Sequence, residues 1–489
     1  MEQIKYTELD DVLSKFSIFG RYHIELLLYL AFAYASNSMY CSNYIFAAEK
    51  IEYRCTDPLY NSSSERNTSR CLEWSYEDPH SFVAEFQIGD QEWKRTLVGT
   101  AHSFGYMIGL LLIGPISDRL GRKKAIVITG VLGGAFGLTK SFTSWYWVYI
   151  ALEFLESALG DICSPLYILN IEIVSTKRRV SYYLLCSLGY ILGSIILPLT
   201  AWAVPYWRNY LRAIYTPAFL FFFYTYLIDE SPRWLLIKGK KDKAITILKN
   251  AAIKNKIQFG KGVLEDLHTE DQKGIGFFNL LRLTFTSPTM LRRCVICIIW
   301  WGTCTFVNYG LIINSVSLEG NKYVNFILMS VLDIPGNFVI MYILLYYKRK
   351  YPLIVTFLLG GVLCMVQPFL PTDLPWLSLI VYITGKLMSS FYFSITYMYT
   401  SELFPTYTRN SMHALCSSLG RIGSIIAPQT PLLMAYWQGL PSMIFGISAV
   451  LAGLITFLVP DTADDSLPDT VRQAEDIGKT KNVKNIEFT

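Results

Sequence analysis

Charged residues are scarce in this chain. Asp, Glu, Lys and Arg make up 17% of its 489 residues and only five are histidines, whereas 52% are hydrophobic and 15% aromatic. Soluble domains carry about 25% charged residues. The mean hydropathy, +0.33, is correspondingly high. The composition therefore excludes an ordinary soluble protein of this size and indicates a membrane protein.

Motifs for catalysis and cofactor binding are also missing. The sequence has no hydrolase, kinase or dehydrogenase signature and no cluster with metal-ligand spacing, so we expect no enzyme, cofactor or metal. Gly130, Gly133, Gly134 and Gly137 lie inside an apolar segment and indicate close helix packing, not a phosphate loop. The basic residues are split among short loops, which argues against nucleic-acid binding.

What the chain has instead is about 12 apolar segments, each near the roughly 20 residues that a helix needs to cross a bilayer. They lie at residues 22–46, 97–116, 125–142, 145–174, 180–204, 211–228, 294–318, 324–347, 352–370, 374–401, 411–437 and 440–459. Lys and Arg gather in alternate loops, as expected of cytosolic loops. The even number of spans then predicts that both termini are cytosolic.

A polar, lysine-rich stretch separates the spans into two groups of six. The predicted organisation is a cytosolic N-terminus (1–21), an N-terminal six-helix half (22–228), a cytosolic linker with amphipathic helices (229–293), a C-terminal six-helix half (294–459) and a cytosolic tail (460–489). The first span is too long for a cleavable signal peptide, so we expect it to remain as an anchor.

One long loop, residues 49–93, is predicted on the extracellular side. It contains glycosylation sequons at Asn61 and Asn67. Cys55 and Cys71 lie in the same loop, and we expect them to form a disulfide in an oxidising exterior. The other eight cysteines fall in or near apolar segments, which is typical of small buried side chains.

The most informative motif joins the second and third apolar segments. Residues 114–124 (GPISDRLGRKK) resemble the signature between the second and third helices of the major facilitator superfamily. Residues 230–235 (ESPRWL) and 402–405 (ELFP) narrow the resemblance to its organic-ion branch, the organic cation, carnitine and organic anion transporters. With residues 467–470 (LPDT) in the tail, the resemblance covers nearly the whole chain.

This resemblance implies an all-α membrane protein with 12 transmembrane helices in two pseudo-symmetric six-helix halves that rock about a central site. It also implies that charged side chains on the cytosolic side hold one state closed. The predicted gating residues are Asp118, Arg119, Arg122, Glu172, Arg178, Glu230, Arg233, Glu402 and Arg409. Glu172 is expected to pair with Arg178 and Arg179, and Glu402 with Arg409. Residues 347–352 (YKRKYP) keep only the bases of the turn, which predicts a weaker latch in the second half.

Ionisable groups inside the membrane are expensive, so they are functional candidates. Glu153, Glu156 and Asp161 fall within the fourth segment, and the first two share a helix face. We expect at least one of them to line the transport path. The alternatives are an internal pair with a base, or a position in an outer vestibule for Glu153.

Three charges of the second half also fall near the middle of their segments. Asp333, Lys386 and Arg421 are expected to meet near the midplane, where such transporters bind substrate. A base at position 421 resembles the anion and carnitine branches and favours a carboxylate. The acids of the fourth segment and the neutral Asn337 favour a positive centre. A zwitterion satisfies both.

Aromatic side chains complete the predicted site. Trp301, Tyr309 and Tyr397 are candidates for a cage around an ammonium group, with Asn308 reshaping one wall. Packing is the alternative for each ring. His102 and His413 are expected to be structural, although either side chain titrates near neutral pH.

These observations predict a plasma-membrane transporter that moves small organic ions by alternating access within the lipid bilayer. Organic cations or carnitine-like zwitterions are the first choice of substrate, and organic anions are the alternative. A non-transporting sensor of the same fold is a remote alternative, because the turn at 114–124 is intact. Coupling to H+ or Na+ stays open.

Overall fold

The computed structural model describes residues 7–59, 70–259, 263–264, 267–268, 287–318, 320–371, 373–404 and 409–461. Two compact units make up the chain: one is formed by Arg21–Glu172 and Arg178–Ser231, the other by Met1–Gly20, Ile173–Lys177 and Pro232–Thr489. Each is described separately.

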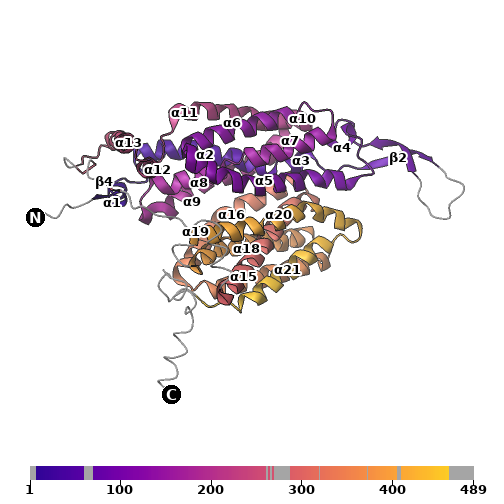
Figure 1. Cartoon of the computed structure of the whole chain (residues 1–489). Coiled ribbons are helices and arrows are strands. Elements are labelled where there is room, and N and C mark those ends of the chain that lie inside the picture. The colour runs from indigo at the N-terminus through magenta and orange to yellow at the C-terminus, as the bar shows by residue number, and fades with distance from the viewer. Residues whose placement is uncertain are drawn as a thin grey trace, which may run out of the picture. The chain divides into compact units, whose positions relative to one another are not determined.

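The first unit is built from long helices linked by shorter pieces. In chain order its elements are α2 (Arg21–Ser42), α3 (Tyr44–Ala47), β2 (Tyr53–Leu59), β3 (Arg70–Tyr76), α4 (Phe82–Glu85), α5 (Glu92–Leu120), α6 (Arg122–Lys140), α7 (Tyr146–Leu159), α8 (Cys163–Ile173), α9 (Arg179–Ala203), α10 (Trp207–Tyr215), the 3-10 helix η2 (Thr216–Phe223) and α11 (Tyr224–Leu227). Helix α2 packs along α9, and α7 packs on α5 and α6 (Figure 1).

The second unit contains the remaining long helices. Its elements are β1 (Thr7–Glu8), α1 (Leu9–Ser14), α12 (Pro232–Ile237), α13 (Lys241–Lys254), β4 (Leu267–His268), α15 (Pro288–Asn314), η3 (Ser315–Ser317), α16 (Lys322–Tyr346), α17 (Lys350–Val366), η4 (Gln367–Phe369), α18 (Pro375–Glu402), α19 (Arg409–Gly420), α20 (Ile422–Ile426), η5 (Ala427–Ala435) and α21 (Leu440–Thr456). Helix α17 packs against α18 and α21, and α15 against α18 and α19. The short 3-10 helix η1 (Thr176–Arg178) lies between α8 and α9.

Six described helices are long and apolar enough to cross a membrane. They are Glu92–Leu120, Ser181–Ala203, Pro288–Ser317, Lys322–Leu344, Lys350–Phe369 and Pro375–Glu402, and Leu440–Thr456 is a shorter apolar helix. The remaining spans of the predicted twelve stay a prediction. Three of them, the fourth, sixth and eleventh, are broken into shorter helices.

A proline stands near one restart in each of these segments. Pro165 lies in the first turn of α8, Pro217 in that of η2, and Pro428 in that of η5. Proline has no backbone N–H to donate, so it fits the first turn of a helix, where that N–H has no partner within the helix. Proline alone does not end a helix here, because α5, α9 and α16 continue through Pro115, Pro198 and Pro335.

The glycines of α6 confirm the prediction of close helix packing. Gly130 faces Phe221, Gly134 faces Ala218 of η2, and a Cβ atom on Gly133 would lie 3.2 Å from the Cα of Gly160. Such contacts leave no room for larger side chains, so α6 approaches its neighbours nearly backbone to backbone.

The long loop contains a small sheet that the sequence did not predict. Strands β2 and β3 pair antiparallel, with Tyr53 opposite Tyr76. Cys55 on β2 is disulfide-bonded. Cys71 lies on β3, but its side chain falls outside the description, so the pairing of the two cysteines stays a prediction. Asn61 and Asn67 also lie outside the described residues.

Candidate functional site

The turn between α5 and α6 organises a cluster around Arg122. Gly121 has φ 105°, a conformation that favours glycine, and the turn brings Arg122 to the first position of α6. Its Nη2 and Nε donate to Glu172 at 2.9 and 3.0 Å, and its Nη1 donates to Asp118 at 2.9 Å. A two-bond guanidinium–carboxylate pair is strong and directional.

Glu230 caps the same end of α6. Its Oε1 accepts the backbone N–H groups of Arg122 at 2.9 Å, Lys123 at 3.2 Å and Ser231 at 3.0 Å. An acid at a helix N-terminus satisfies otherwise unpaired donors and complements the helix dipole. Burial nevertheless raises the pKa of Glu230 above its ordinary value, against the opposing effect of these backbone hydrogen bonds.

A counterpart of the Arg122 cluster is present in the second unit. Arg349 directly precedes α17 and its Nε lies 3.2 Å from Oε1 of Glu402, the last residue of α18. The carboxylate of Glu172 pairs with Arg122, so its predicted pairing with Arg178 and Arg179 is wrong. The side chain of Arg409 lies outside the described residues.

The other predicted gating residues are less buried. Arg119 is exposed, and Arg178 and Arg233 are partly buried. Asp118, which contacts Arg122, has a side chain 67% accessible. Glu172, with a side chain 10% accessible, is therefore the more buried of the two acids that bind Arg122.

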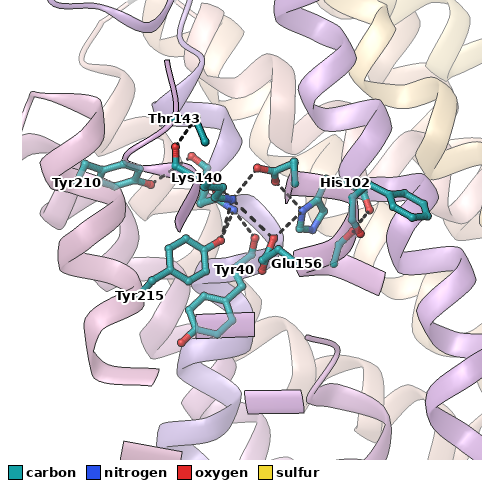
Figure 2. Close-up of polar contacts among 11 residues, drawn as sticks. Tyr40, His102, Lys140, Thr143, Glu156, Tyr210 and Tyr215 are labelled. Atoms are coloured by element: carbon teal, nitrogen blue, oxygen red, sulfur yellow. Dashed lines mark hydrogen bonds and ion pairs between the residues drawn. The ribbon is translucent and has the colours of Figure 1, made fainter. Parts of the chain in front are cut away.

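A second charged cluster lies at the opposite end of α6. Lys140, the last residue of that helix, points its Nζ to Oε2 of Glu153 at 2.6 Å and lies 3.7 Å from Oε2 of Glu156. Nδ1 of His102 on α5 lies 2.9 Å from Oε1 of Glu153 and 3.5 Å from Oε2 of Glu156 (Figure 2). The two acids and the lysine are 0 to 2% exposed.

Polar neutral groups complete the shell around Lys140. Its Nζ also donates to Oδ1 of Asn43 at 3.3 Å and to the hydroxyl of Tyr215 at 3.1 Å. The ammonium lies 4.8 Å from the centroid of the Tyr215 ring, a cation–π contact. Every side chain named here belongs to the first unit.

This geometry selects one of the alternatives left open for the fourth segment. Glu153 and Glu156 form an internal pair with a base, and that base, Lys140, was missed by the sequence analysis. The sequence does show a feature that could have identified it, because Lys140 is a lysine near the end of an otherwise apolar segment. The ligand atoms of His102, Glu153 and Glu156 lie within 4.8 Å of one another. Because the Lys140 ammonium already occupies this set, we do not assign a metal to it.

Asp161 caps the start of α8 and is not one of the acids bound to Lys140. Its Oδ1 accepts the backbone N–H of Cys163 at 2.9 Å, and its Oδ2 accepts the hydroxyl of Ser164 at 2.7 Å. These bonds satisfy donors at the start of α8, where the chain resumes a helix after the break at Gly160. A contribution of Asp161 to a transport path stays a prediction.

The second unit joins Asp333 of α16 to Lys386 of α18, as predicted. The Lys386 Nζ lies 2.8 and 3.1 Å from the two oxygens of Asp333. Ser390, one turn further along α18, accepts from Lys386 at 2.8 Å and donates to Asp333 at 3.0 Å. The lysine is buried, but the Asp333 side chain stays 28% exposed.

Arg421 contacts Tyr309. Its Nη1 donates to the tyrosine hydroxyl at 3.1 Å, which links the end of α19 to α15. Asn308, the neighbour of Tyr309, donates to Ser389 of α18 at 3.2 Å. The three charges predicted to meet are thus found as an Asp333–Lys386 pair and an Arg421–Tyr309 contact.

Comparisons with known proteins identify the family of this chain. A profile of the Major Facilitator Superfamily matches residues 30–428. Solute carrier family 22 member 3 of Mus musculus is 31% identical over 451 residues, which is 90% of this chain and 81% of that protein. Solute carrier family 22 member 2 of Homo sapiens is 30% identical over 463 residues, 91% and 81% of the two chains. This chain belongs to the major facilitator superfamily. Within it, the chain is a member of solute carrier family 22.

Solved structures of the superfamily share the fold. The inward open conformation of the xylose transporter XylE from E. coli aligns with a TM-score of 0.65 at 17% identity, covering 92% of this chain and 98% of that one. The crystal structure of a D-xylose-proton symporter aligns with a TM-score of 0.64 at 16% identity, covering 91% and 100%. At such identities the likeness shows the fold alone.

Membership of the superfamily confirms the resemblance read from residues 114–124 and the predicted fold class. Its members matched here are solute carriers, so the predictions of a membrane transporter and of a protein that is not an enzyme are also confirmed.

The predicted aromatic cage is divided between core and surface in this solute carrier. Trp301 is 1% exposed and its indole N–H donates to Thr400 at 3.1 Å, so it belongs to the core of the second unit. Tyr397 is 38% exposed. The His413 ring packs edge-on against both, with centroids 5.3 Å from Trp301 and 4.4 Å from Tyr397. Packing explains Trp301, whereas Tyr397 is exposed and Tyr309 is partly buried.

Proposed function

We propose that this protein carries small organic ions across the plasma membrane by alternating access, with organic cations or carnitine-like zwitterions as its substrates. The observation that carries the proposal is the Asp333–Lys386–Ser390 group, because an acid that is both hydrogen-bonded and 28% exposed is held ready for a positively charged substrate. An ionisable side chain inside a membrane-spanning segment of a transporter marks a substrate or ion pathway.

Further groups support a substrate that carries both charges. The guanidinium of Arg421, oriented by Tyr309 at 3.1 Å, offers a carboxylate the strong, charge-assisted hydrogen bonds that arginine forms. The accessible rings of Tyr309 and Tyr397 offer their faces to an ammonium group. Since Lys386 offsets much of the charge on Asp333, we favour a zwitterion over a simple cation.

Organic anions are the alternative substrate class. Glu153 and Glu156 are engaged with Lys140 and His102, and Asp161 binds the start of α8. These acids therefore add less to a preference for cations than the sequence suggested, and Arg421 alone would suit an anion.

The orientation and modifications belong to the same proposal. We place both termini and the linker 229–293 in the cytosol, on the side of the Arg122 cluster, with the loop 49–93 outside the cell. Glycosylation at Asn61 and Asn67 and a Cys55–Cys71 disulfide follow from that orientation. The division into halves at 22–228 and 294–459 is proposed likewise.

Uptake measurements test the substrate class. Cells expressing the full chain would be given radiolabelled tetraethylammonium, carnitine or para-aminohippurate, which represent a cation, a zwitterion and an anion. We expect uptake of carnitine or tetraethylammonium above mock-transfected cells, with a large loss in Asp333→Asn at equal surface expression. Uptake confined to para-aminohippurate would establish the anion alternative. Absence of all three, with binding of any, would point to a sensor.

A further inference from the structure

The cluster around Lys140 holds an uneven number of charges. It contains two carboxylates, Glu153 and Glu156, one ammonium and the imidazole of His102. With a neutral imidazole and both acids ionised, the cluster carries one net negative charge. Burying an unbalanced charge is strongly destabilising, and a protein avoids this by binding a counter-charge or a proton.

The surrounding groups do not supply that counter-charge. Each described element packed against the cluster presents side chains that carry no formal positive charge: Tyr40 and Cys41 of α2, Tyr44 of α3, Tyr149 of α7, and Tyr210 and Tyr215 of α10. Two arginines of α10, Arg208 and Arg212, donate to Ser141 beside Lys140 and not to the two acids. Arg208 is already paired with Glu85 at 2.7 Å.

The two acids are not equivalent. Glu153 has both oxygens engaged, Oε1 by His102 at 2.9 Å and Oε2 by Lys140 at 2.6 Å, which suits a permanent anion. Oε2 of Glu156 is buried without a hydrogen-bond partner, and it faces His102 Nδ1 at 3.5 Å and Lys140 Nζ at 3.7 Å. A buried carboxylate oxygen that has ion-pair contacts but no hydrogen bond is an unusual and costly feature.

We propose that this cluster is a proton-binding site, in which one exchangeable proton is shared between His102 and Glu156. In the conformation seen here the proton makes the cluster neutral. On release, the proton passes to water, Glu156 becomes a carboxylate beside a neutral His102, and the net charge of the cluster changes from 0 to −1. No electrons are transferred.

The proton bound at this site is the coupling ion of the proposed transporter. His102 lies on α5, Lys140 on α6 and the two acids on α7. A change in the charge of the cluster therefore changes the electrostatic attraction among these three helices. A ligand that binds one conformation more tightly shifts the population toward it. The inference rests on the proposed transport function, and it states that H+ is the coupled ion instead of Na+.

The cluster and the Arg122 pair occupy the two ends of one helix. Arg122 is the first residue of α6 and Lys140 the last, so at about 1.5 Å per residue they lie roughly 27 Å apart. Protonation at one end of α6 is therefore linked through a rigid element to the ion pairs at its other end. Such a link is what couples a proton to a conformational cycle.

Thermal unfolding of the purified full chain tests the site without any substrate. Release of the proton leaves a net negative charge buried in the folded protein but exposed to water in the unfolded chain, so the contribution of the cluster to stability is present at low pH and lost as pH rises. We expect the melting temperature of the wild type to fall between about pH 5 and pH 8. Glu156→Gln removes the excess charge and should flatten this dependence, whereas Glu25→Gln, a surface control, should leave it unchanged.

Parallel pH profiles for the wild type and Glu156→Gln would overturn the proposal. If Glu156→Gln does not fold, His102→Gln serves as the second variant, and its profile should shift because only Glu156 can then take the proton. A rise in the melting temperature with added Zn²⁺ that is lost in Glu156→Gln would assign these side chains to a metal and also overturn it.

Transport in proteoliposomes tests the coupling itself. An imposed pH gradient should change the accumulation of tetraethylammonium or carnitine by about tenfold in the wild type, and Glu156→Gln should lose this dependence while exchange without a gradient persists. Gradient-dependent accumulation that is equal in both proteins would exclude the cluster. If neither probe is transported, the proposed function fails, and the unfolding profiles still decide whether the site binds a proton.

Discussion

Arg349 pairs with Glu402 in the same way that Arg122 pairs with Glu172. Each arginine stands at the start of a helix that follows a tight turn, and each glutamate lies at or near the end of another helix of the same unit. The first pair has two bonds of 2.9 and 3.0 Å between side chains about 10% exposed. The second has one contact of 3.2 Å between side chains about 20% exposed. The internal repeat therefore extends to side-chain chemistry, and its second copy is weaker.

The first prediction follows from this difference. Glu172→Gln is expected to lower the maximal rate of uptake by roughly tenfold, because an ion-pair change of about 1.4 kcal/mol is enough for that shift in population. The apparent affinity should change much less. Initial rates over a range of substrate concentrations, corrected for surface expression, measure both. Glu402→Gln is the matched variant and should have a smaller effect, and an equal or larger one would refute the ranking.

The second prediction concerns Glu230 as the cap of α6. Glu230→Gln keeps an oxygen that accepts backbone N–H groups, so the melting temperature should change little. Glu230→Ala leaves three donors without that acceptor and should cost about 1 to 2 kcal/mol. Because burial raises the pKa of Glu230, the wild-type protein should lose some stability as pH rises and this carboxyl group ionises. The Gln variant cannot ionise at this position, so its stability should fall less at high pH. Equal losses in the two variants would show that the charge, and not the hydrogen bonding, matters.

The third prediction separates two substrate classes through Arg421. Arg421→Gln removes the positive charge but keeps a hydrogen-bond donor toward Tyr309, and it should weaken carnitine uptake far more than tetraethylammonium uptake. The reason is that the loss of one partner of a desolvated ion pair costs several kcal/mol. Competition assays with both compounds measure the difference. Similar losses for the two substrates would assign Arg421 a structural role.

The fourth prediction addresses the stability of the Lys140 cluster. Lys140→Met leaves two buried carboxylates without their ammonium and should destabilise the protein by about 3 to 5 kcal/mol. The double variant Lys140→Met with Glu153→Gln removes one of those charges and should recover much of the loss. Thermal unfolding of the two single variants and the double variant gives the coupling. Additive losses would mean that the 2.6 Å contact contributes little.

Much of this protein could be predicted from the sequence. Apolar segments and the distribution of basic residues indicated a membrane protein, because burial in lipid imposes a composition and charge pattern that no soluble fold requires. The resemblance of residues 114–124 to a known signature indicated the major facilitator superfamily. Asp333, Lys386 and Arg421 were expected to meet near the midplane, because all three lie near the middle of apolar segments; the structure pairs Asp333 with Lys386 and gives Arg421 a contact with Tyr309.

The tertiary structure decided the rest. Three predicted spans are divided into shorter helices, and the prolines in the sequence do not show which spans these are, because α5, α9 and α16 continue through Pro115, Pro198 and Pro335. Glu172 forms an ion pair with Arg122, 50 residues away in the sequence, and not with the nearby Arg178 and Arg179. Glu153 and Glu156 form ion pairs with Lys140 on another helix. Sequence can reveal that a buried charge must be neutralised, but the choice of partner depends on which helix faces pack together, and that choice is made by long-range contacts such as those of the α6 glycines.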